Sequence, residues 1–539
     1  MKKFFILFAT ICCWHITNAD ACTSLLAGRG ATTDGSTFIT YAADSHTLYG
    51  SLVYIPATHY PENTMLEVKE WDTGKPLGHI PQVESTYAVM GNMNEYQLSI
   101  TESTWGGRPE LVDTTGIIDY GSLMFITLQR AKTAREAIKV MTDLVKKHGY
   151  YSSGESFSIA DPNEVWIMEM IGKGVHNKGA VWVAVRIPDD CISAHANQAR
   201  IHTFPLDDKD NCVYSPDVIS FAREKGYFDG LNKDFSFANA YAPADFGALR
   251  GCEARVWSFF RKFNNTMDDY LSYINGESKT PIPLYVKPNR KLSAQDMKDA
   301  MRDHFENTPF DMTQDVGAGP FKVPYRFRPM TFTVDSVEYT QERAIATQQT
   351  GFTLVAQMRN WLPDAVGGVL WFGVDDTNTC VYIPIYCSAT EVPECFNPKN
   401  GSLYKLSWTS AFWIHNWVAN MAYARYNYMI KDIRPVQQQL ENEFNTWQPS
   451  IEKAAIDLYK NDKDAAIRFL TAYSVAQAQR STARWKELGE YLMVKYLDGN
   501  IKREKDGQFM DNGYGLPESP EFPGYSEEYY RAVAKDAGE

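Results

Sequence analysis

The N-terminal half of the chain alternates short apolar runs with turn residues, a pattern typical of antiparallel strands. Residues 22–28 and 36–42 are apolar-rich, and the loop between them contains Asp34-Gly35, a strong hairpin signal. We therefore predict a β-hairpin whose first strand starts at Cys22. A second strand pair is expected over residues 87–90 and 97–101.

A helix that starts near residue 133 is predicted to follow these strands. Thr133-Ala134-Arg135-Glu136 has the form of a capping box, apolar residues then recur at helical spacing, and Gly149 is a typical stop. Strand-like runs follow at residues 156–160, 165–171, 181–187 and 192–196. Their connections are too short for βαβ crossovers, so we expect an antiparallel meander.

After residue 215, predicted helices alternate with a further group of strands. Residues 215–275 are helical in pattern, another helix starts at Ser293, and residues 327–386 return to strands, including 369–373 and 380–383. Residues 407–497 have helical spacing almost throughout, whereas 511–525 are rich in proline and glycine. This order predicts a layered α+β fold rather than a doubly wound sheet.

The first 21 residues have the features of a secretory signal peptide. Lys2 and Lys3 precede a short apolar run, and Ala19-Asp20-Ala21 offers the small residues that a signal peptidase reads. The run is too short for a membrane span, which takes about 20 residues, and no second candidate span occurs. We predict cleavage after Ala21 and export, either to the periplasm or out of the cell.

Composition and motifs narrow the function classes. The net charge of −13 argues against nucleic-acid binding, because phosphates require a basic surface. The sequence has no P-loop, no H-E-x-x-H, no G-x-S-x-G and no C-x-x-C, so we expect neither a metal nor a cofactor. Beyond Cys12, Cys13 and Cys22, six cysteines either form disulfides or lie as buried thiols: Cys191, Cys212, Cys252, Cys380, Cys387 and Cys395.

Cleavage after Ala21 would give Cys22 a free α-amine beside its thiol. An α-amine has a pKa of about 7.7–8.0, so near neutral pH it can accept the proton of a thiol whose pKa is about 8.5. A nucleophile and its general base would then share one residue, which suits acyl transfer through a thioester. One alternative is a lipid-anchored cysteine, although Ala19 stands where a lipobox prefers leucine, and another is a plain structural cysteine.

Several motifs, in order, resemble the dipeptidase A family of cysteine N-terminal-nucleophile (Ntn) hydrolases, which is distantly similar to choloylglycine hydrolases and penicillin V acylases. The matching segments are Cys22-Thr23, Asp34-Gly35-Ser36, residues 91–95, 101–103, 156–169, 193–197, 308–311, 319–321, 361–363 and 367–371. The resemblance implies a four-layer αββα sandwich of two antiparallel sheets. We therefore divide the chain into a signal peptide (1–21), an Ntn-hydrolase catalytic domain (22–400), a helical region (401–510) that packs on or completes the catalytic domain, and an irregular tail (511–539).

When the family's site residues are matched to this sequence, the resemblance implies that the Cys22 thiol is the nucleophile and that its α-amine is the base. Asp44 would hold the amine and thiol, Asn197 would orient the nucleophile or the substrate, and Arg255 would favour the thiolate. The candidates for substrate contact are Glu102, Ser103 and Asn94.

Two departures favour the peptidase branch over the acylases. Tyr41 stands where the acylases carry an arginine, and residues 101–104 lack their oxyanion asparagine, so the oxyanion donor is open. We predict an exported cysteine dipeptidase that acts on small peptides and has no transmembrane span. The alternatives are an N-acyl amino-acid amidase and a lipid-anchored peptide-binding protein without turnover, and homo-oligomerisation is open.

Overall fold

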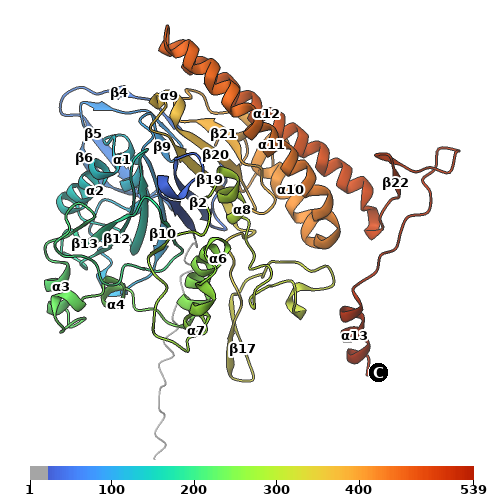
Figure 1. The fold of residues 1–539 in the computed structure, drawn as a ribbon, viewed down its shortest axis with the longest axis horizontal. Helices are drawn as coiled ribbons and strands as arrows, with labels where there is room; N and C mark the ends of the chain where they lie inside the picture. Colours follow the sequence, from blue (N-terminus) through green and yellow to red (C-terminus); the bar gives the residue numbers. More distant parts are fainter. Residues whose placement is uncertain (1–21, 539) are drawn as a thin grey trace, which may run out of the picture.

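The computed structural model describes residues 22–538, so the predicted signal peptide lies outside the described residues. Two large antiparallel sheets form its centre, which confirms a mixed helix and sheet fold (Figure 1). In spatial order the seven-stranded sheet contains β16 (Tyr285–Val286), β14 (Ile192–His195), β1 (Ser24–Ala27), β2 (Thr37–Asp44), β19 (Thr350–Met358), β20 (Val369–Val374) and β21 (Ile383–Tyr386). The eight-stranded sheet contains β15 (Cys212–Tyr214), β13 (Ala180–Ile187), β12 (Val165–Gly172), β11 (Gly154–Ala160), β10 (Ser99–Trp105), β9 (Met93–Asn94), β8 (Val89–Met90) and β3 (Tyr54–Ile55).

The predicted N-terminal hairpin is confirmed. Strands β1 and β2 pair antiparallel with Leu26 opposite Ile39, and Gly35 supplies the positive φ of 85° that the turn requires. Both strands are buried along their whole length, which explains why their sequences are apolar rather than alternating.

Two strand-pairing predictions are wrong. The short strand β9 lies between β8 and β10, so the predicted pair 87–90 and 97–101 does not form directly. The meander holds for β11, β12 and β13, but β14 leaves it and pairs with β1. Backbone hydrogen bonds from Gly28 and Gly30 to the loop before β14 hold this strand in the seven-stranded sheet. The approach is close enough to require glycine, because a Cβ at Gly28 would lie 2.6 Å from the Asp189 carbonyl oxygen.

The sheets pack against each other and against helices. Strand β2 contacts β10 and β11, which brings the two sheets face to face. Helices α1 (Tyr120–Leu128) and α2 (Ala134–His148) pack on the eight-stranded sheet, and the N-cap Thr133 and C-cap Gly149 bound α2 as predicted. On the seven-stranded sheet, α6 (Ala254–Phe263) contacts β14 and α8 (Ala294–Ala300) contacts β19.

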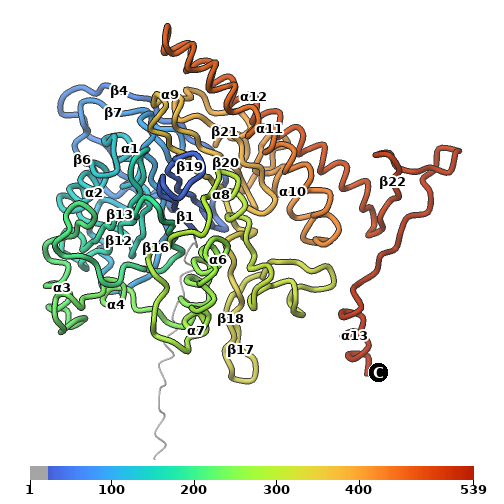
Figure 2. Tube along the Cα trace, in the orientation of Figure 1, coloured from blue at the N-terminus to red at the C-terminus, as the bar shows by residue number. Residues whose placement is uncertain are grey.

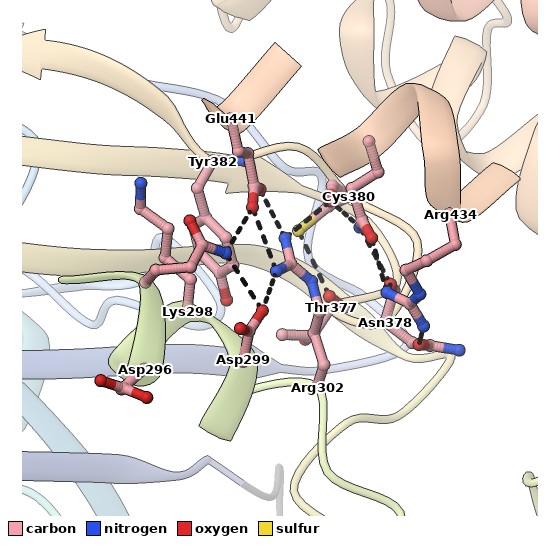
Figure 3. Close-up of polar contacts among 12 residues, drawn as sticks. Asp296, Lys298, Asp299, Arg302, Thr377, Asn378, Cys380, Tyr382, Arg434 and Glu441 are labelled. Atoms are coloured by element: carbon pink, nitrogen blue, oxygen red, sulfur yellow. Dashed lines mark hydrogen bonds and ion pairs between the residues drawn. The ribbon is translucent and has the colours of Figure 1, made fainter. Parts of the chain in front are cut away.

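The predicted helical C-terminal region is confirmed. Helices α10 (Ala411–Ala424), α11 (Tyr426–Tyr459) and α12 (Lys463–Lys495) lie along the β20–β21 edge of the seven-stranded sheet (Figure 1). A buried ion pair joins α11 to this body: Arg302 contacts Glu441 at 2.5 Å, and Glu441 also accepts a hydrogen bond from the backbone N–H of Tyr382 (Figure 3). The predicted strand 380–383 instead begins at Ile383.

Beyond α12 the chain extends away from the sheets (Figure 2). The prediction of an irregular tail over 511–539 is wrong for α13 (Glu527–Asp536), which Ser526 caps by accepting a hydrogen bond from the Tyr529 backbone. None of the residues of α13 is buried. Within residues 22–538, no helix is both long and apolar enough to cross a bilayer.

Candidate active site

Cys22 lies two residues before the start of β1, with 5% of its surface exposed. The hairpin sets Thr23 opposite Ala42, so the next pair is Cys22 with Ala43. Because side chains alternate across a strand, Cys22, Ala43 and Tyr41 share one face. The Cys22 thiol donates a hydrogen bond to the Tyr41 hydroxyl over 3.8 Å, and that hydroxyl donates to the Glu102 carboxylate.

A cavity of about 70 Å³ opens beside the thiol. Strands β2 and β10, helix α1 and the loop before β6 (Pro76–Pro81) supply its walls. The wall is aromatic and acidic, and it includes Tyr41, Trp71, Asp72, Glu102, Tyr120 and Phe352. The site therefore offers a nucleophile at the edge of a negatively charged, ring-lined hollow.

Arg255 reaches Cys22 from the helical side. A π-helical turn, Leu249–Glu253, leads into α6 and places this side chain in the protein interior. Its Nη1 donates to the Cys22 carbonyl oxygen at 2.8 Å and to Thr23 Oγ1 at 2.7 Å, and its Nε donates to the Gly251 carbonyl. The guanidinium thus fixes the backbone that carries the thiol.

Asn197 and Asp44 complete this side of the site. Asn197 adopts a φ of 59°, accepts a hydrogen bond from Arg255 Nη2 at 2.8 Å and donates to the Thr104 carbonyl at 2.6 Å. Asp44 follows Ala43, the residue opposite Cys22, and is fully buried. Its carboxylate contacts Arg343 at 2.5 Å and accepts a hydrogen bond from Thr350 Oγ1 at 2.6 Å. The four residues carried over as catalytic therefore lie together.

Two of the candidates for substrate contact lie elsewhere. Ser103 alternates with Glu102 on β10 and bonds His195 Nδ1 at 2.6 Å. Asn94 uses its amide to hold a turn, donating to the carbonyls of Leu128 and Ala131. Neither side chain lines the cavity at Cys22, whereas Glu102 does.

Burial controls the charges around the thiol. It raises the pKa of Cys22, as do the Glu102 and Asp44 carboxylates, while hydrogen bonds from the Asp44 backbone and Tyr41 oppose them. Burial also raises the pKa of Glu102 to about 7. It lowers the pKa of His195 to about 3, with Arg200 and Arg255 adding to the effect, so this imidazole is neutral.

Other groups near the site do not form a metal centre or a disulfide. Within residues 22–538, no cluster of three or more histidine, cysteine, aspartate and glutamate side chains is placed to hold a metal ion. The seven cysteines of this range are free, and all but Cys252 are buried. Of the two alternatives for the six beyond Cys22, the structure favours buried thiols.

Sequence reasoning missed several partners of these residues. Arg343 and Thr350 hold Asp44 from 299 and 306 residues away, and Tyr120 and Trp71 come from other elements again. Nothing in the local pattern marks them, because each is defined by a tertiary contact. Only Tyr41 could have been found from the strand pattern, because it lies two residues from Ala43, the partner of Cys22, and therefore on the same face of the sheet as Cys22.

Comparison with known proteins identifies the family. Residues 21–439 match the profile of peptidase family C69. A probable dipeptidase from Latilactobacillus sakei is 27% identical over 84% of this chain and 90% of its own length. Dipeptidase A from Lactobacillus helveticus is 24% identical over 92% of this chain and 97% of its own. The resemblance to the dipeptidase A family is confirmed, and this chain belongs to peptidase family C69.

Proposed function

We propose that the protein is an exported cysteine dipeptidase of the Ntn-hydrolase type, active once residues 1–21 are removed. Relatives that align over most of the chain are named dipeptidases, which supports the substrate class. Two packed antiparallel sheets with helices on each support the four-layer αββα arrangement. An acidic cavity wall suits a free amino group better than an acyl chain, which favours a dipeptidase over an N-acyl amidase.

The surroundings of Cys22 carry this proposal. With a peptide bond before it, the thiol is buried beside carboxylates and stays protonated at neutral pH. No lysine or histidine of the described chain lines the cavity, and His195 is held by Ser103 and Ser158 instead. An α-amine on Cys22 would supply a base with a pKa near 8 at the required place. Asp44, beside the pairing partner of Cys22, would stabilise the ammonium form.

The reaction then needs only groups of this chain, the substrate and water. The α-amine takes the thiol proton, and the thiolate attacks the carbonyl carbon of the first residue of the dipeptide. The tetrahedral intermediate collapses, the C–N bond breaks, and the leaving amine takes the proton from the α-ammonium. Water, deprotonated by the same amine, hydrolyses the thioester and restores the thiol. Arg255 and Asn197 position the nucleophile throughout.

Expression of the full chain in an exporting bacterium tests the proposal. Intact mass should give a mature protein that starts at Cys22, and this protein should release both amino acids from a panel of dipeptides. Cys22→Ala should release none, whereas Cys212→Ala, which removes a buried thiol distant in sequence, should behave as wild type. Turnover by Cys22→Ala, or no turnover of any dipeptide by the mature protein, would contradict the proposal.

A further inference from the structure

The cavity at Cys22 adjoins a second, larger cavity of about 670 Å³. Thr104 lines both, and its neighbours hold it in place: Oγ1 donates to Glu155 at 2.7 Å, and the carbonyl accepts from Asn197. We propose that the smaller cavity binds the α-ammonium group of the dipeptide and the larger cavity binds its α-carboxylate. This assignment rests on the proposed dipeptidase function, and it places the scissile bond across Cys22.

The smaller cavity has the composition of an ammonium site. Asp72 and Glu102 contribute carboxylates, and no lysine or arginine of residues 22–538 lines this cavity. Tyr120 donates a hydrogen bond to Asp72 at 2.7 Å, and Tyr41 donates to Glu102, so both carboxylates are oriented by aromatic side chains. Carboxylates among aromatic rings combine ion pairing with cation–π attraction, which a primary ammonium can use together.

The larger cavity has the opposite charge. Four arginines line it, against the two carboxylates of Glu110 and Asp245: Arg108, Arg255, Arg328 and Arg343. Arg343 is paired with Asp44, and the three other arginines still outnumber the carboxylates of Glu110 and Asp245, so the wall carries a net positive charge. An anionic group of the substrate is therefore favoured here.

Arg108 is the best placed of these arginines to receive a carboxylate. Its guanidinium stacks on the Tyr227 ring, 3.7 Å from the centroid, and its Nε donates to the Ala240 carbonyl at 2.6 Å. Among the described residues these contacts leave both Nη groups without a hydrogen-bond acceptor. An arginine fixed in this way can bind a carboxylate through two N–H groups at little entropic cost.

The contacts of Cys22 with the smaller cavity and with Arg255 set the direction of binding. Cys22 lines the smaller cavity, and Arg255, which lines the larger one, contacts the Cys22 carbonyl oxygen at 2.8 Å. In a dipeptide the ammonium belongs to the residue that becomes the thioester, and the carboxylate belongs to the residue that leaves. The charges of the cavities therefore put the acyl residue by β10 and the leaving residue by Arg108.

Blocked substrates test the assignment with the mature protein. The substrates are Ala-Leu, N-acetyl-Ala-Leu and Ala-Leu amide, and the readout is kcat/KM from amino-acid release. Each block removes one charged contact, so each should lower kcat/KM by about 100-fold. If Ala-Leu and a wider dipeptide panel are not hydrolysed, the dipeptidase function fails. If the blocked peptides are hydrolysed as fast as Ala-Leu, only the terminus assignment is overturned.

Two variants test which cavity binds which end. Asp72→Asn should raise KM for Ala-Leu about 10-fold and leave hydrolysis of N-acetyl-Ala-Leu unchanged. Arg108→Gln should do the same for Ala-Leu but leave the amide unchanged, with Arg223→Gln, an exposed arginine outside both cavities, as the matched control. Equal losses on free and blocked peptides would overturn the assignment, as would the reverse pattern of selectivity. A thermal melt of each variant separates these outcomes from misfolding.

Discussion

Arg255→Lys tests whether the hydrogen bonds of this arginine position Cys22. The arginine donates five hydrogen bonds from three nitrogens, to Cys22, Thr23, Gly251, and residues 196 and 197. An ammonium group keeps the charge but offers three protons, so at least two of the five contacts are lost. At about 1.5 kcal/mol for a hydrogen bond from a charged donor, the free energy of unfolding should fall by about 3 kcal/mol.

The same change should affect catalysis more than binding. Once Cys22 loses its fixed carbonyl contact, a displacement of the thiol by about 1 Å would lower kcat by about 100-fold and change KM little. Guanidinium unfolding followed by tryptophan fluorescence, together with dipeptide kinetics, measures both effects. Arg223→Lys, an exposed arginine on α3 (Val218–Glu224), is the control. Wild-type stability and kcat in Arg255→Lys would refute the positioning role.

Three further changes give distinct outcomes. Glu441→Gln should leave the buried Arg302 with only its ion pair to the exposed Asp299 and lower the free energy of unfolding by about 3 kcal/mol, whereas Asp457→Asn, which breaks only exposed ion pairs, should change it little. Because the pKa of Glu102 is raised to about 7, stability should fall as pH rises from about 4.5 to 7. Glu102→Gln should remove about 3 kcal/mol of that fall in unfolding titrations, and an unchanged profile would contradict the shift. Tyr41→Phe removes the hydroxyl that contacts Glu102, so kcat should fall about 10-fold or more. Iodoacetamide labelling of the Cys22 thiol should slow less than 3-fold. Wild-type kcat would exclude a role for the hydroxyl.

Local signals explain what the sequence could predict. The Asp34-Gly35 turn, the Thr133 cap and the helical spacing after residue 407 each depend on neighbours along the chain, and each element is present. Strand β14 shows the limit of such signals. Its short connection from β13 is typical of a meander, but the contacts of Gly28 and Gly30 with that loop decide its sheet.

Some features of the site could likewise be predicted from the sequence, and others could not. Cys22 could be found from its place after a signal-like segment, and the family resemblance supplied Asp44, Asn197 and Arg255. The two cavities could not be predicted, because their charges come from segments far apart in the chain, such as residues 72 and 102 in one and residues 108 and 328 in the other. Only the packed structure brings these charges into two adjoining cavities near Cys22.

The proposed mechanism depends on the α-amine of Cys22 as the general base. Insertion of one alanine between Ala21 and Cys22 tests it directly, since cleavage after Ala21 would then leave the thiol in place and turn the base into an amide. The mature variant, verified by intact mass and by a wild-type thermal melt, should lose at least about 100-fold in kcat on dipeptides. Wild-type turnover by this folded variant would contradict the mechanism.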